Sequence, residues 1–64
     1  MWNTIHISSN LNYAKKIETM LKNEGFFVRI RDFSPGDGKL VYELQALVHE
    51  AKDAHEFIIE NGIR

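Results

Sequence analysis

The sequence contains no cysteine, which excludes disulfide bridges, thiol nucleophiles and thiolate metal sites. It also has no apolar run near the roughly 20 residues that a membrane-crossing helix needs. The first residues, MWNTIHISS, have neither the basic nor the apolar segment of a secretion signal. Because small extracellular domains usually depend on disulfides or metals, these absences predict a cytoplasmic protein that does not associate with a membrane.

An excess of charge of one sign is also missing. Eight lysines and arginines stand against nine acidic residues, for a formal net charge of −1, which provides no strong field toward nucleic acid or membranes. The length of 64 residues predicts a single domain over residues 1–64, and a chain of this size buries only roughly 60% of its unfolded surface. That volume argues against an enclosed active site. We therefore expect no enzyme activity, no catalytic residues and no cofactor.

What the sequence does contain is two kinds of hydrophobic period. Residues 2–8 alternate as a half-buried strand does, with Ile5 and Ile7 on one side. Residues 11–24 then carry apolar side chains at helical spacing, after Asn10 as a capping residue and before Gly25 as a stop signal. These signals predict a strand followed by a helix.

Residues 26–48 predict two strands that fold back on each other, because both runs alternate and SPGDG at residues 34–38 supplies a turn. The apolar faces lie on the same side only if paired residue numbers sum to an even value. A sum of 72 sets Arg29 opposite Glu43, and a sum of 74 sets Arg31 opposite Glu43. Both registers satisfy the pattern.

A second helical pattern follows residue 50, and Gly62 with Ile63 repeats the stop signal. The predicted fold is therefore α+β, in the order β-α-β-β-α. Right-handed crossover of the first unit gives a three-stranded antiparallel sheet in the order 1-3-2, which is a ferredoxin-like arrangement without its last strand. One edge of the first strand is then unpaired. Both helices are expected to cover the face that carries Ile5, Ile7, Phe26, Val28, Ile30, Tyr42, Leu44 and Ala46.

The opposite face combines large apolar side chains with arginines, and it also includes Thr4 and Gln45. One interpretation is that scattered exposed aromatics are normal and that Arg29 and Arg31 merely pair with Glu43. The other is an interaction surface, because aromatic residues and arginine are enriched at interfaces. The candidate binding surface consists of Trp2, His6, Phe27, Arg29, Arg31, Phe33, Val41, Glu43 and Leu47.

Three other chemistries are disfavoured. Aromatic residues and arginines on a ferredoxin-like sheet also bind RNA in one class of modules, but the consensus of those modules is absent from KLVYELQAL. The histidines, His6, His49 and His55, have no spacing that would let them share a metal, so no metal site is predicted. The GDGK at residues 36–39 is too short for a phosphate loop and precedes a strand instead of a helix.

Three segments carry a family resemblance over nearly the whole chain: the initial MW, LKNEGFFVRIR, and YELQALVHEAKDAHEFII. They resemble the small βαββα domains grouped as prokaryotic signal-transducing proteins. The resemblance implies a bacterial cytoplasmic domain of ferredoxin-like topology with a regulatory or binding role, and it implies no catalytic residues. Two features depart from the pattern: His49 stands where the family has proline, and the hairpin loop is short.

The expected function is that of a non-enzymatic regulatory or interaction module. Its partner would be another protein or a second copy, bound through the uncovered sheet face and the unpaired edge of the first strand. The alternative is a domain that binds a small ligand or single-stranded nucleic acid through Arg29, Arg31 and the aromatic side chains of the sheet.

Overall fold

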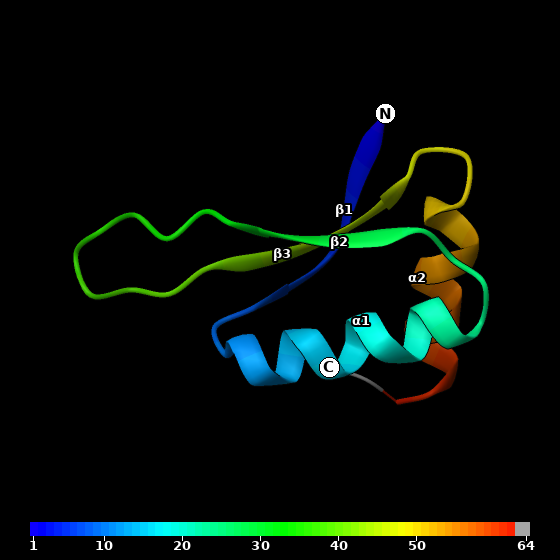
Figure 1. Cartoon of the computed structure of the whole chain (residues 1–64), viewed down its shortest axis with the longest axis horizontal. Coiled ribbons are helices and arrows are strands. Elements are labelled where there is room, and N and C mark those ends of the chain that lie inside the picture. The colour runs from blue at the N-terminus through cyan, green and yellow to red at the C-terminus, as the bar shows by residue number, and fades with distance from the viewer. Residues whose placement is uncertain (63–64) are drawn as a thin grey trace.

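The computed structural model describes residues 1–62 and contains three strands and two helices. Along the chain these are β1 (Trp2–Ser8), α1 (Leu11–Asn23), β2 (Val28–Asp32), β3 (Tyr42–Leu47) and α2 (Ala51–Glu60). The sheet is antiparallel in the order β1-β3-β2, with both helices on one side of it (Figure 1). The predicted fold class, element order and strand order are confirmed. The stop signal predicted at Ile63 lies outside the described residues.

A single core lies between the sheet and the helices. Each helix contributes its apolar stripe, and the sheet contributes the residues that alternate toward the helices. Phe26, Ile30 and Tyr42 pack against this core while partly exposed, as the predicted face requires. The buried members are Ile5, Ala14, Ile17, Leu21, Val28, Leu44, Ala46, Ala54 and Ile58.

The β2–β3 register resolves the two alternatives that the sequence left open. Arg31 lies opposite Glu43, and Val28 lies opposite Ala46, which corresponds to the sum of 74. β2 begins at Val28, two residues later than predicted, because the preceding residues are engaged in ending α1. The connection between the strands is also longer than the predicted turn, since β2 ends at Asp32 and β3 begins at Tyr42.

The end of α1 explains why β2 starts late. Gly25 has φ +94, in the left-handed region that glycine adopts without strain. Its N–H donates to the Lys22 carbonyl at 3.0 Å, and the Phe26 N–H donates to the Leu21 carbonyl at 3.1 Å. These two bonds form a Schellman cap, which satisfies the last carbonyls of the helix. The cap holds Phe26 against the core before the chain becomes extended.

β1 contains a β-bulge between Thr4 and His6, and this corrects two sequence predictions. Thr4 lies opposite Gln45, but His6 lies opposite Leu44, so the extra residue Ile5 shifts the alternation by one. His6 was predicted on the uncovered face. It lies instead on the helix side, half-buried, with its ring centroid 6.5 Å from that of Tyr13 in α1.

For Ile7 the correction is the reverse of that for His6. It was predicted to face the helices, yet it lies opposite Glu43 and is 61% exposed on the uncovered face. A bulge places two successive residues on the same side of a strand, so every later residue exchanges faces. The exchange removes His6 from the candidate surface and adds Ile7 to it.

The base of the hairpin is fixed by Asp32 and Ser34. The Asp32 carboxylate accepts the Ser34 N–H at 2.9 Å, and the Ser34 hydroxyl accepts the Val41 N–H at 3.0 Å. Hydrogen bonds from the side chain and the backbone of Ser34 hold the pKa of Asp32 below its ordinary value of 3.8. A carboxyl whose pKa is lowered on folding stabilises the fold above its ordinary pKa, and this contribution is lost as pH falls through the lowered pKa.

We predict that Ser34→Ala raises the pKa of Asp32 toward its ordinary value, because it removes the larger of the two hydrogen-bonding causes and leaves the backbone N–H. Titration of the Asp32 carboxyl carbon by NMR measures this directly. Ser9→Ala, at an exposed serine before α1, is the matched control and should leave the Asp32 titration unchanged. An Asp32 pKa that is the same in Ser34→Ala and in the unaltered protein would contradict the prediction.

Candidate interaction face

We define the open face as the side of the sheet that the helices leave uncovered. The structure places on it every residue of the candidate binding surface except His6, and it adds Ile7. Phe27 precedes β2 and alternates with the buried Val28, so its side chain borders this face. The open face consists of Trp2, Thr4, Ile7, Phe27, Arg29, Arg31, Phe33, Val41, Glu43, Gln45 and Leu47.

The centre of the open face is a stack built from all three strands. Arg29 of β2 extends across β3, and its guanidinium carbon lies 4.5 Å from the centre of the Trp2 ring on β1. The Arg29 Nε donates a hydrogen bond to Gln45 Oε1 of β3 at 2.8 Å. Gln45 is only 9% exposed although no helix covers it, since Trp2 and Arg29 lie over it. We call Trp2, Arg29 and Gln45 the central stack.

A second arginine repeats this arrangement further along β2. The Arg31 guanidinium carbon lies 5.5 Å from the centre of the Phe33 ring. Arg31 is opposite Glu43 in the register, but the Glu43 carboxylate accepts the Thr4 hydroxyl at 2.6 Å and makes no ion pair with a residue of the described range 1–62. Within residues 1–62 the single side-chain ion pair joins Lys22 to Glu18, at 3.4 Å. Of the predicted pairing of both arginines with Glu43, the structure has the strand register of Arg31 with Glu43 and, within residues 1–62, no ion pair.

Three large apolar side chains of the open face are exposed to solvent. Phe27 is 66% exposed, Ile7 is 61% exposed and Phe33 is 48% exposed. Trp2, Leu47 and Val41 are partly buried beside them. The sequence predicted Phe27 and Phe33 from their alternation, but it gave no signal for Ile7, because a bulge leaves the alternation of residue types intact.

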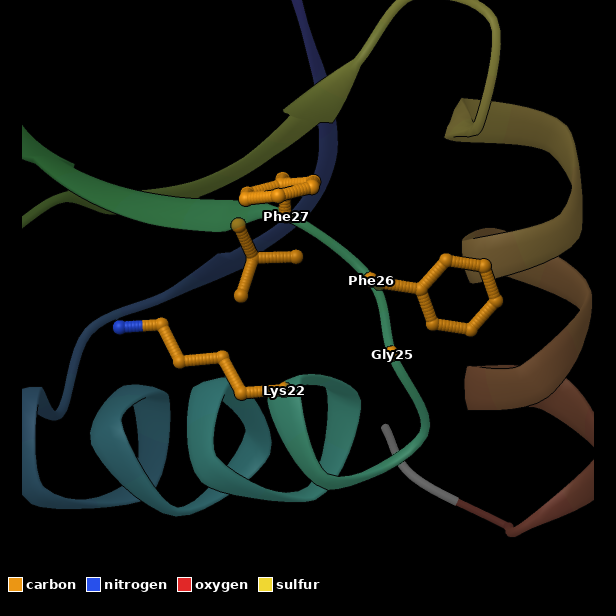
Figure 2. A pocket seen from close by; sticks show the side chains of 5 residues that line it. Lys22, Gly25, Phe26 and Phe27 are labelled. Carbon is orange, nitrogen blue, oxygen red and sulfur yellow. The ribbon is translucent and has the colours of Figure 1, made fainter.

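A hollow lies at the start of β2, on the border between the open face and α1. It has a volume of about 500 Å³ and is lined by Lys22, Gly25, Phe26, Phe27 and Val28. Figure 2 shows Phe26 directed toward α2, with Phe27 above the chain and Lys22 extending from α1 below it. The lining of the hollow has one charged side chain, Lys22, and no carboxylate, and Lys22 is paired with Glu18 of the same helix at 3.4 Å.

The backbone of Phe27 is held by Glu50, the residue that precedes α2. Hydrogen-bonded pairs alternate along an antiparallel ladder, and the Phe33 N–H bond to the Val41 carbonyl at 2.8 Å makes Phe27 a bonding position facing Leu47. The Phe27 N–H instead donates to Glu50 Oε1 at 3.1 Å, and the Leu47 carbonyl accepts the Glu50 N–H at 2.8 Å. Glu50 thus takes the place of the hydrogen bond that would otherwise join the Phe27 N–H to the Leu47 carbonyl at the end of the sheet.

Neither a metal-binding cluster nor a membrane-spanning helix is found in the described part of the chain. No three histidine, cysteine or acidic residues of residues 1–62 come together in a group that could hold a metal ion. Neither α1 nor α2 is long and apolar enough to cross a membrane. Comparison of the sequence and the structure with known protein families, curated proteins and solved structures finds no match.

Proposed function

We propose that this chain is a non-enzymatic interaction module of the bacterial cytoplasm that binds another protein surface through its open face. The observation that carries the proposal is the exposure of Ile7, Phe27 and Phe33 beside two arginines that form no ion pair with any residue of the described part of the chain. Exposed aromatic residues together with arginine are the composition of an interface core. The resemblance to prokaryotic signal-transducing domains supports a regulatory role for this binding.

The edge of β1 extends the proposed surface only in part. β1 pairs with β3 on one side, so its other edge carries backbone groups that no strand of residues 1–62 pairs. The bulge between Thr4 and His6 interrupts this edge in its middle. Bulges are a common means of preventing edge strands from pairing indiscriminately. We therefore assign the main contact to the face and a minor one to the segment of β1 around Trp2.

Self-association is the simplest form of this function to test. We predict that the unaltered protein dimerises weakly and in a concentration-dependent manner, and that Phe27→Asp weakens the dimer by at least about tenfold. The physical reason is that an aspartate would have to be desolvated where Phe27 now offers apolar surface. Sedimentation equilibrium over a wide concentration range measures the dissociation constant of both proteins.

Ile59→Asp is the matched control, because Ile59 is 60% exposed on α2 and does not belong to the open face. This variant should dimerise as the unaltered protein does. A protein that stays monomeric at the highest concentration, with no change on Phe27→Asp, would remove self-association from the proposal. Equal weakening by both substitutions would assign the contact to general surface hydrophobicity and contradict the role of the open face.

A second candidate function is the binding of a small anionic ligand or of single-stranded nucleic acid through Arg29 and Arg31. The observation in its favour is that each guanidinium is next to an aromatic ring, Trp2 or Phe33, and forms no ion pair with an acidic residue among residues 1–62. Aromatic rings and arginines together are also how sheet surfaces stack bases. The mixed charge of the face, which includes Glu43, favours a protein partner over a polyanion.

A further inference from the structure

The central stack holds a partly buried cation without a counter-charge. The hydrogen bond of Arg29 to Gln45 is partly buried, and no carboxylate of residues 1–62 lies within 4.0 Å of the guanidinium. Withdrawing a charge from water costs free energy that an ion pair or a set of hydrogen bonds normally offsets. Here the Trp2 ring offsets part of it through a cation–π contact. The rest of this cost is offset by no carboxylate of the described residues, so an anion from outside the chain would lower it.

The guanidinium is also fixed in an orientation that suits such an anion. Its Nε is engaged by Gln45, whereas its two terminal nitrogens donate to no acceptor among residues 1–62. These nitrogens form a planar fork that matches the two oxygens of a carboxylate. Because Trp2 and Gln45 already hold the side chain, little conformational entropy is lost when the fork is occupied. The central stack is thus arranged for an oxyanion before one binds.

A second guanidinium lies two residues further along β2. Arg31 lies two residues beyond Arg29 on the same face of β2, next to the Phe33 ring. Two residues of a strand span about 6.7 Å, and this is also the distance between alternate side chains of any extended peptide. Two carboxylates at alternate positions of an extended segment would therefore have the same spacing as Arg29 and Arg31. They would point to one side of the segment and carry the opposite charge.

We propose that the open face binds an extended acidic segment of a partner protein, with acidic residues at alternate positions, one carboxylate on Arg29 and the next on Arg31. This inference deepens the proposed function and rests on it. The residues between the acidic ones would point away from the open face. Apolar residues at the next alternate position on either side of the acidic pair would contact Phe27 and Phe33, which flank the arginines in the sequence. The molecule measures only 16 Å along its shortest axis, the axis of view in Figure 1, so a narrow segment fits the sheet better than a broad surface does.

A second copy of the chain does not supply this ligand. None of its nine acidic residues is two positions from another. Two open faces in contact would also bring four arginines against two Glu43 carboxylates, which keeps self-association weak. A free small anion fits less well, because the arginines lie on an uncovered sheet and not in the hollow beside Lys22.

The test uses the single tryptophan of the chain, Trp2, as a fluorescent reporter inside the proposed site. Capped Val-Glu-Val-Glu-Val is titrated into dilute protein at low salt, with capped Val-Gln-Val-Gln-Val as the control peptide. We expect saturable binding of the acidic peptide alone. Arg29→Gln and Arg31→Gln should each weaken it at least about tenfold, since each removes a charge-assisted pair.

Lys52→Gln is the matched control for loss of one positive charge, because Lys52 is exposed on α2 and belongs neither to the open face nor to the lining of the hollow. It should bind the acidic peptide as the unaltered protein does. Arg29→Lys keeps the charge but loses the planar fork, so it should recover only part of the affinity. Circular dichroism of each variant checks that the fold is retained, and the NMR signal of the Arg29 Nε–H reports binding independently of Trp2.

Several results would overturn the inference. Absence of saturable binding would do so, as would equal affinity for the glutamine peptide or equal weakening by Lys52→Gln. Tighter binding of inorganic phosphate would assign Arg29 to a small anion, and tighter binding of oligouridine would assign the face to single-stranded RNA. If the peptide fails while Phe27-dependent dimerisation is observed, the inference fails and the proposed function stands. If both fail, the inference and self-association are both removed.

Discussion

Leu44→Ala should lower the free energy of unfolding by about 3 kcal/mol, which is a large part of the total for a domain of this size. Leu44 is 0% exposed on β3, the central strand, and lies between His6 of β1 and Ile30 of β2. Removing its three terminal carbons loses their transfer free energy and leaves a cavity that a sheet held on both sides cannot close. Urea unfolding followed by circular dichroism gives the change directly.

The reason for so large an effect is the size of the domain. At 64 residues, a typical stability is roughly 3 to 10 kcal/mol, so one core leucine is a large share of the total. We expect the melting temperature to fall by about 15 °C. Leu40→Ala is the control, since Leu40 is 52% exposed in the hairpin connection, and it should shift the midpoint little. Similar losses at both positions would mean that Leu44 is not at the centre of the core.

Ala14→Leu should also destabilise the fold, by about 2 kcal/mol, through the opposite mechanism. Ala14 is 0% exposed on the side of α1 that packs on the sheet. A small side chain there lets the helix approach the strands closely, and the added carbons of leucine would push α1 away or force unfavourable rotamers. Thermal unfolding of the variant and of the unaltered protein measures the difference.

Lys15→Leu is the matched control for this second substitution. Lys15 is the next residue of α1 and is exposed, and leucine and lysine have similar helix propensities. It should therefore leave the stability within about 0.5 kcal/mol of the unaltered protein. A stability of Ala14→Leu equal to or above that of the unaltered protein would show that space remains between α1 and the sheet.

The fold could be predicted because its signals are local. The helical spacing before Gly25, the alternation around the hairpin and the rule that apolar faces must coincide reduced the β2–β3 register to two values. Choosing between them needed the loop geometry, which depends on contacts of Ser34 with Asp32 and Val41 that residue types alone do not specify. The start of β2 was likewise decided by a helix cap and by Glu50, two partners distant from the strand pattern.

The candidate surface could be predicted in composition but not in detail. Alternation placed Arg29, Arg31 and the aromatic residues on one side correctly. It placed His6 and Ile7 on the wrong sides, because residues 4–7 alternate equally well with or without a bulge, and only the pairing with β3 reveals the extra residue. The contact of Arg29 with Trp2 joins two strands that are not neighbours in the sheet, so no pairing rule predicts it.

The bond between Glu50 and the Phe27 backbone has a consequence for how the two sides of the molecule are connected. Glu50 immediately precedes α2, which packs behind the sheet, while Phe27 borders the front. One carboxylate thus joins the border of the open face to the start of the helical layer. A substitution at Glu50 would therefore leave the Phe27 N–H without its acceptor as well as altering the residue before α2.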